Sequence, residues 1–140
     1  MKLKLTTMIL AVVCLAGCKT TNKATEANSK PLIGTQWNLV ALYGEPIDSN
    51  QVIQPFIIFD ADGNFNGNLG CNTFFGSYYQ KKQKLELNYS GATKRLCHEM
   101  DTERAVLKAL KEEISSYTIA GNVLTLYANK VEILRFESQE

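Results

Sequence analysis

The sequence predicts an α+β fold, in which an antiparallel β-sheet roll of about seven or eight strands packs on a single α-helix. From Thr35 onward, short runs of alternating apolar and polar residues are bounded by Gly, Asn, Asp or Lys, which is typical of antiparallel strands. One segment has helical spacing instead. An amphipathic helix inside such a chain must bury its apolar stripe against the sheet.

Alternation predicts the first three strands. Trp37, Leu39 and Ala41 share one face of a strand that Gly44 ends. Pro55 opens a second strand, 56–59, which is apolar on both faces. Asp62-Gly63 then predicts a hairpin, because this pair tolerates the positive φ angles of a type I′ turn. In the strand that follows, one face carries Phe65, Gly67, Leu69 and Cys71.

The later strands are also short. We expect a hairpin of 77–80 with 84–88 across Lys81-Lys82-Gln83, and three meandering strands around 117–119, 124–126 and 134–136, with turns at Gly121-Asn122 and Asn129-Lys130.

The helix is predicted between His98 and Glu113. There, helical spacing relates the apolar residues Met100, Val106, Leu107, Leu110 and Ile114. Asp101 or Thr102 is expected to cap its start.

Residues 1–17 have the pattern of a secretory signal peptide. Lys2 and Lys4 precede a short apolar stretch, 8–15, and Ala16-Gly17 stand before Cys18. The stretch is shorter than the roughly 20 residues that span a bilayer. Leu15-Ala16-Gly17-Cys18 resembles the bacterial lipobox, which implies cleavage before Cys18 and acylation of its thiol. Because Lys19 stands where lipoproteins kept at the inner membrane often have Asp, this resemblance implies the outer membrane, with the protein lipid-anchored and facing the periplasm.

The polar segment 18–31 then reads as a lipidated flexible tether, followed by one domain over 32–140. Loss of Lys2 and Lys4 takes the formal net charge from +1 to about −1. With no basic excess, we expect no nucleic-acid partner; the predicted partners are the membrane, through Cys18, and an envelope protein or lipid ligand.

Cys71 and Cys97 are the thiols left inside the domain, and an oxidising envelope compartment predicts a disulfide between them. The alternative is a small envelope hydrolase or thiol-redox protein that uses Cys71 or Cys97, with His98 as the available base. Two cysteines and one histidine leave a zinc site one ligand short, so we predict neither a metal nor a cofactor.

Three further patterns can be interpreted either as structural features or as functional sites. Asp62–Gly67 begins like an EF-hand loop, but Thr73 stands where the bidentate Glu is needed, so a hairpin turn is the better account. Glu103 suits the first turn of the helix, and a catalytic partner for it cannot be placed. Core packing is the default for the aromatic cluster Phe74, Phe75, Tyr78 and Tyr79, which is also a possible surface for a ligand or partner.

The chain resembles the META domain family, which includes heat-shock lipoproteins of the HslJ type. The matching residues include Gly34-Thr35-x-Trp37-x-Leu39, Gly67, Gly70-Cys71-Asn72, Gly76, Tyr78, Thr93-x-x-x-Cys97, Glu103, Leu124-x-Leu126 and Leu134-x-Phe136.

This resemblance implies a strand roll around one helix, and a link to heat shock and novobiocin tolerance. No established catalytic activity comes with the family. We therefore expect a non-catalytic outer-membrane lipoprotein of the HslJ type that supports envelope stress tolerance, and not an enzyme. Thr73-Phe74-Phe75 departs from the charged or polar residues that are often found there.

Overall fold

The computed structural model describes residues 28–48, 50, 53–98 and 100–139. The predicted signal peptide, Cys18 and most of the predicted tether lie outside the described residues. No helix in the described part of the chain is long and apolar enough to cross a membrane.

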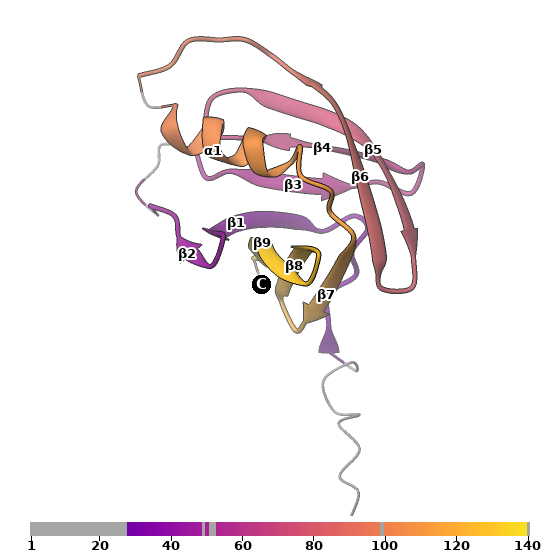
Figure 1. Cartoon of the computed structure of the whole chain (residues 1–140). Coiled ribbons are helices and arrows are strands. Elements are labelled where there is room, and N and C mark those ends of the chain that lie inside the picture. The colour runs from indigo at the N-terminus through magenta and orange to yellow at the C-terminus, as the bar shows by residue number, and fades with distance from the viewer. Residues whose placement is uncertain (1–27, 49, 51–52, 99, 140) are drawn as a thin grey trace, which may run out of the picture.

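The described residues form nine strands and one helix (Figure 1). In chain order they are β1 (Gln36–Leu42), β2 (Glu45–Pro46), β3 (Phe56–Phe59), β4 (Asn64–Asn68), β5 (Thr73–Lys81), β6 (Lys84–Ala92), α1 (Asp101–Ala109), β7 (Ser116–Ala120), β8 (Val123–Ala128) and β9 (Val131–Ser138).

The strands form one antiparallel sheet that closes on itself. The sheet order is β2-β1-β3-β4-β5-β6-β7-β8-β9, and β1 also pairs with β9. The predicted roll is thus confirmed in its antiparallel, sheet-dominated character, but the strand count exceeds the prediction. The extra strand is the two-residue β2, formed because the chain turns back at Gly44, where φ is +82°, and pairs with the end of β1.

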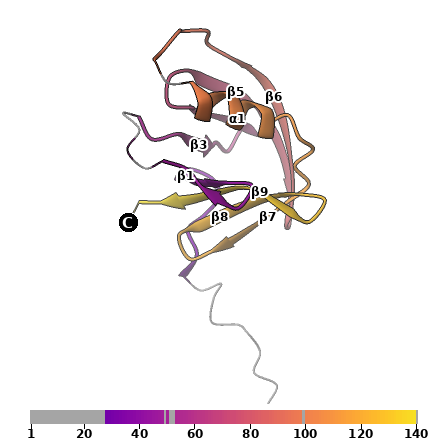
Figure 2. The same cartoon turned by 60° about the vertical axis from the view of Figure 1, so that its left-hand side comes forward.

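The closed sheet has a weak seam between β6 and β7, which are joined in the described residues through one residue pair, Lys84 with Ser116. Helix α1 lies beside β5 and β6, and the chain that follows it leads down to β7 (Figure 2). Just past its end, the Lys111 ammonium lies 5.9 Å from the ring centre of Tyr89 on β6. The Tyr43 hydroxyl, after β1, donates to Glu112. The turn that follows the helix therefore contacts both β6 and the end of β1.

The helix is shorter than its apolar spacing predicts. It starts at Asp101, and the residue in the N-cap position is Met100, with no side-chain cap. The prediction that Asp101 or Thr102 would be the cap was wrong, because both are already helical; Asp101 instead places its charge in the first turn, near the positive end of the helix dipole. The helix ends at Ala109, after which Lys111 and Glu112 donate to Lys108 and Ala109 in a tighter turn.

Large apolar side chains fill the interior. The fully buried ones include Trp37, Leu39, Ile57, Phe59, Phe65, Leu69, Leu85, Leu110, Ile114, Leu124, Leu126 and Leu134. The Trp37 indole N–H donates to the carbonyl of Leu32 at 3.1 Å, so the segment before β1 is attached to this core. The space that the sheet encloses is thus packed with side chains.

Two glycines allow β4 and β5 to approach with aromatic rings between them. Phe65 on β4 pairs with Gly76 on β5, and Gly67 pairs with Phe74. A Cβ atom at Gly76 would lie 2.5 Å from the Phe65 ring, and one at Gly67 would lie 2.6 Å from the Phe74 ring. Each ring thus occupies the space above the opposite glycine.

The predicted hairpin between β3 and β4 is present, but its turn differs from type I′. Of the two central residues, Gly63 alone has a positive φ, +83°. The Asp60 carboxylate organises the turn, since it accepts from the backbone N–H groups of Asp62 at 3.0 Å and Asn64 at 2.8 Å. These hydrogen bonds, that from Asn64 first, lower the pKa of Asp60 below its ordinary value. The predicted turns at Gly121-Asn122 and Asn129-Lys130 are present, with positive φ angles at Gly121, Asn129 and Lys130.

Candidate functional site

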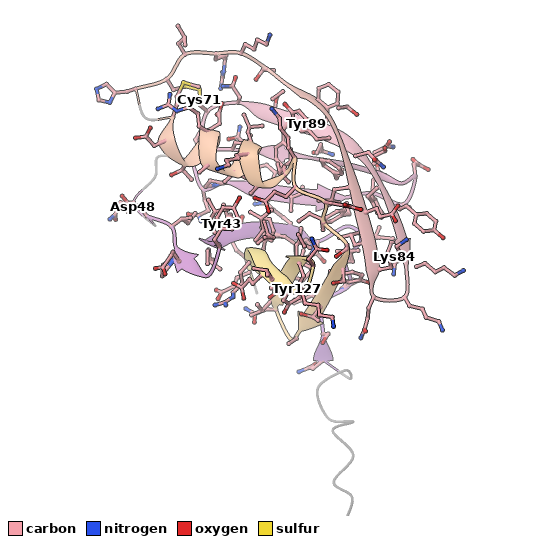
Figure 3. The ribbon with its side chains drawn as sticks, viewed as in Figure 1. Tyr43, Asp48, Cys71, Lys84, Tyr89 and Tyr127 are labelled. Carbon is pink, nitrogen blue, oxygen red and sulfur yellow. A yellow bond between two sulfur atoms is a disulfide. The ribbon has the colours of Figure 1, made fainter. Side chains whose placement is uncertain are left out.

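A disulfide joins Cys71, just after β4, to Cys97, in the segment that leads into α1 (Figure 3). The two Cα atoms are 6.1 Å apart. Cys71 is buried, at 2 % exposure, and Cys97 is exposed. The bond therefore holds the β6–α1 connection against the turn between β4 and β5, and it leaves no thiol on either residue.

Asn72 is the centre of a buried hydrogen-bond network beside this disulfide. Its backbone N–H donates to Oε2 of Glu103 at 2.9 Å, and its Nδ2 donates to Oε1 of Glu103 at 2.8 Å and to the Arg95 carbonyl at 3.0 Å. Its Oδ1 accepts from the Thr93 hydroxyl and from the Arg95 backbone N–H, both at 2.7 Å. The side-chain amide of Asn72 thus uses both donors and both acceptor lone pairs.

Glu103 is 4 % exposed and lies on the first turn of α1. Within the described residues it forms no ion pair with a basic side chain; its two oxygens accept from Asn72 instead. A buried carboxylate needs such hydrogen bonds, because leaving it unpaired is costly. The structure thereby shows a structural contact for Glu103, its hydrogen bonds from Asn72, which the sequence did not indicate.

The segment between β6 and the disulfide is fixed through its backbone. Thr93 donates its N–H to the carbonyl of Thr73 at 3.0 Å and accepts from the Thr73 N–H at 3.2 Å. The Arg95 guanidinium donates to the Cys71 carbonyl at 2.6 Å. Leu96, next along the chain, is 95 % exposed. The segment therefore presents an apolar side chain to solvent from a well-anchored backbone.

These contacts give the family-matching residues a structural role. Cys71, Asn72, Thr93, Cys97 and Glu103, which we call the clamp residues, all bond to one another or to the backbone between them. The part of the chain that the structure describes holds no group of three or more His, Cys, Asp or Glu side chains placed to bind a metal ion. The clamp residues fasten the helix to the sheet, and their polar side-chain atoms form the hydrogen bonds that do so.

The four aromatic residues of β5 point to opposite sides of the sheet and do not form one surface. Phe74 is 3 % exposed, and Tyr78 is half-buried, with its ring 5.1 Å from that of Phe59 and its hydroxyl donating to the Asp60 carbonyl at 2.6 Å. Burial raises the pKa of Tyr78. Phe75 and Tyr79 lie on the outer face, 54 % and 52 % exposed. Of this cluster, only these two are available to a ligand or partner.

Two shallow hollows adjoin the segment before β1. One, of about 410 Å³, is lined by Ser29, Lys30, Pro31, Leu32, Gln83, Tyr117, Thr118 and Ile119. The other, of about 300 Å³, is lined by Lys30, Thr35, Gln36, Asn38, Ser138 and Gln139. The larger hollow mixes polar and apolar side chains, the smaller one is lined mainly by polar residues, and both include Lys30.

Sequence reasoning missed two members of the network, Asn72 and Arg95. The signal for Asn72 was present, since Gly70-Cys71-Asn72 carries much of the resemblance, but a motif does not say what its amide contacts. Arg95 acts partly through backbone atoms that any residue would supply, so its side-chain type gave no signal for those contacts.

Comparison with known proteins places this architecture among solved folds. The META domain model matches residues 30–140. An NMR structure of a protein from Burkholderia xenovorans superposes with a TM-score of 0.62 at 24 % identity, covering 77 % of this chain and 83 % of that one. A crystal structure of a DUF4847 family protein from Bacteroides vulgatus gives a TM-score of 0.58 at 20 % identity, covering 78 % and 96 %. No significant match is found among the curated proteins.

Proposed function

This chain belongs to the META domain family, and from that premise we propose that it is a non-catalytic lipoprotein of the outer membrane. In this proposal Cys18 carries the lipid, residues 1–17 are removed, and the domain faces the periplasm. It binds an envelope protein or lipid there and supports envelope stress tolerance, including tolerance of novobiocin, as HslJ-type members do.

One observation carries the non-catalytic part of the proposal: the clamp residues are bonded to one another. A nucleophilic cysteine needs a free thiolate, whereas Cys71 and Cys97 form a disulfide. A catalytic carboxylate needs a reacting group within reach, whereas both oxygens of Glu103 accept from Asn72. The residues that carry the family resemblance thus support a scaffold.

The outer face supports a binding role. Phe75, Tyr79 and Leu96 are the exposed apolar residues closest in sequence to the clamp residues, with exposures of 54 %, 52 % and 95 %. Aromatic side chains with this exposure are common in contact surfaces for protein partners. We place the partner contacts on these side chains, outside the packed interior.

Lipidation is tested by mass spectrometry of the N-terminal peptide of the protein purified from its native membrane. The proposal expects a peptide that begins at Cys18 and carries acyl chains. A Cys18→Ala variant should remain unprocessed, whereas Cys14→Ala, a matched change inside the predicted signal peptide, should be processed normally. A native peptide that begins at Met1 would refute this part of the proposal.

The physiological role is tested with a deletion strain. We expect the strain to become more sensitive to novobiocin, and a copy of the natural chain, but not the Cys18→Ala variant, to restore tolerance. Unchanged novobiocin tolerance and envelope permeability in the deletion strain would contradict the stress role. The alternative, a hydrolase or thiol-redox protein using Cys71 or Cys97, requires one of them to react with a thiol reagent in the unreduced native protein.

A further inference from the structure

Four lysines lie around the end of the domain where its first described residues are found. Lys81 ends β5, Lys82 lies in the turn that follows and Lys84 begins β6, whereas Lys30 precedes β1; all four are exposed. Lys30 and Gln83 line the same hollow of about 410 Å³, so the turn and the N-terminal segment lie together. Lys30 thus lines a hollow that also includes Tyr117 and Ile119, and the other three lysines flank Gln83, which lines the same hollow.

This end of the domain is locally basic, although the chain as a whole is nearly neutral. Lys84 pairs with Glu86 at 2.6 Å. Lys30, Lys81 and Lys82 have no ion-pair partner among the described residues, and no acidic side chain lines the hollow. Three cationic groups are therefore available to an anionic ligand.

The lysines are carried on fixed backbone. The Lys30 N–H donates to the Gly121 carbonyl at 2.9 Å, and the Gly121 N–H donates to the Ser29 hydroxyl at 3.2 Å. On the other side of the hollow, the Gln80 amide donates to the Lys82 carbonyl at 2.8 Å and to the Tyr117 hydroxyl at 3.0 Å. Their spacing is thus set by the fold.

Two views place this end opposite the helix. In Figure 1 and Figure 2 the first described residues emerge at the end of the molecule away from α1 and the connection that precedes it. Cys18 precedes Asn28 by ten residues, which reach at most about 36 Å when extended. An anchor at Cys18 would therefore keep these lysines and the hollow beside them close to the membrane surface.

We propose that Lys30, Lys81 and Lys82 bind the anionic headgroups of phospholipids, so that the domain rests on its membrane with this end down and with α1 and Leu96 directed away. This inference rests on the proposed anchoring at Cys18 and adds the lipid class and the orientation. Lysines near an anionic membrane each strengthen binding by about fivefold. Tyr117 and Ile119, which line the hollow with Lys30, supply an aromatic hydroxyl and an apolar side chain that suit the interface between headgroups and acyl chains.

The test is a lysine footprint on the native protein, reconstituted in vesicles of phosphatidylcholine alone or of phosphatidylcholine with phosphatidylglycerol. Chemical labelling of Lys30, Lys81 and Lys82 by an amine-reactive reagent should be about fivefold slower in the mixed vesicles. High salt should remove this protection. Lys94 and Lys108, which belong to the opposite end, should react equally in both. Equal reactivity of all five lysines in both kinds of vesicle would overturn the inference.

Variants separate charge from folding. Lys81→Gln with Lys82→Asn removes two charges, and Asn at position 82 tolerates the positive φ of 56° found there. It should abolish the protection of Lys30, whereas the matched pair Lys94→Gln with Lys108→Gln should retain it. Protection of Lys30 that persists in the first variant would overturn the inference. Protection in isolated outer membranes but not in anionic vesicles would also overturn it, because the lysines would then contact another envelope polymer.

The two proposals fail in different ways. An N-terminal peptide without acyl chains refutes the anchoring but not the headgroup contact, because the unacylated protein can be mixed with the same vesicles and footprinted. An acylated protein whose lysines are unprotected refutes the headgroup contact alone.

Discussion

Replacing Asn72 with Asp changes one atom of the buried network and turns a donor into an acceptor. The Asn72 Nδ2 group lies 2.8 Å from Oε1 of Glu103 and 3.0 Å from the Arg95 carbonyl, and it donates to both. An Asp oxygen in its place would face two acceptors, one of them a carboxylate. The two hydrogen bonds that are lost contribute about 1 kcal/mol each.

The repulsion between the carboxylates adds to this cost. Like charges this close cannot both stay ionised in a buried site, so one carboxyl would take up a proton and its pKa would rise, at about 1.4 kcal/mol for each unit. We expect a total loss of about 4 kcal/mol near neutral pH, out of the ~5–15 kcal/mol typical of a domain. Since the raised pKa belongs to the folded state, the penalty should be largest above it, should shrink as the pH falls from this value to the unfolded carboxyl pKa, and should be absent below that.

A second substitution should reverse part of the damage. In Asn72→Asp with Glu103→Gln, the Gln amide can donate to the new Asp oxygen while its carbonyl still accepts from the backbone N–H of residue 72. We expect about 2 kcal/mol to be recovered, which leaves the contact between Asp and the Arg95 carbonyl unsatisfied. Glu103→Gln alone should destabilise the domain, because its amide would face an Asn72 donor.

Denaturant unfolding of the four proteins with the disulfide intact would measure this cycle. Asn88→Asp, at an exposed position of β6, is the matched control and should change the free energy of unfolding by less than about 0.5 kcal/mol. If the double variant is destabilised by the sum of the two single effects, Asn72 and Glu103 are not coupled and the clamp interpretation is refuted.

Three further predictions concern the disulfide, β5 and the contact between Tyr43 and Glu112. Reduction of the disulfide should lower the free energy of unfolding by about 3 kcal/mol, as expected for a closed loop of 26 residues, measured by denaturation with and without reductant. Gly76→Ala should cost at least about 2 kcal/mol, because the new Cβ would lie 2.3 Å from the Asn88 carbonyl oxygen; Gly91→Ala, where the nearest atom is 3.5 Å away, is its control. Burial and then the Glu112 contact raise the pKa of Tyr43 from 10.0 to about 12, so stability should fall as pH rises through this interval, and Tyr43→Phe should remove that part of the loss.

Each of these three predictions would be contradicted by a specific result. An unchanged unfolding midpoint after complete reduction would mean that the disulfide does not constrain the unfolded chain. Equal stability of the Gly76→Ala and Gly91→Ala variants would show that the strands separate to accept a methyl group. An ultraviolet titration in which Tyr43→Phe removes a phenol of ordinary pKa would contradict the Tyr43–Glu112 contact.

The sequence was sufficient to predict features that depend on local periodicity. Alternation located β1, β3 and β8 within a residue or two, because the side chains of a half-buried strand must alternate between core and solvent. The disulfide followed from the number of cysteines and the expected compartment, and the structure contains it. These inferences need only neighbouring residues or a residue count.

Features that depend on distant residues were not predictable. Glu103 is 31 positions from Asn72, so neither residue alone indicates that their polar groups meet in a buried site. Helical periodicity continued to Ile114, yet α1 ends at Ala109, because apolar residues past a helix can also face the core from a turn. The aromatic residues of β5 alternate between the core and solvent, as side chains of a strand do. Because they are close in sequence, they were interpreted as one cluster.

The clamp residues act where the helix needs support. A nine-residue helix without a side-chain cap is marginal alone. The disulfide and the Asn72–Glu103 contacts fasten its start, and the contact of Tyr43 with Glu112 fastens the turn beyond its end. Because this fastening uses buried groups, substitutions of Phe75, Leu96 or the lysines around Lys82 can alter binding without loosening the scaffold. Family membership in this case therefore predicts how the helix is held, while the ligand must be sought on the exposed side chains.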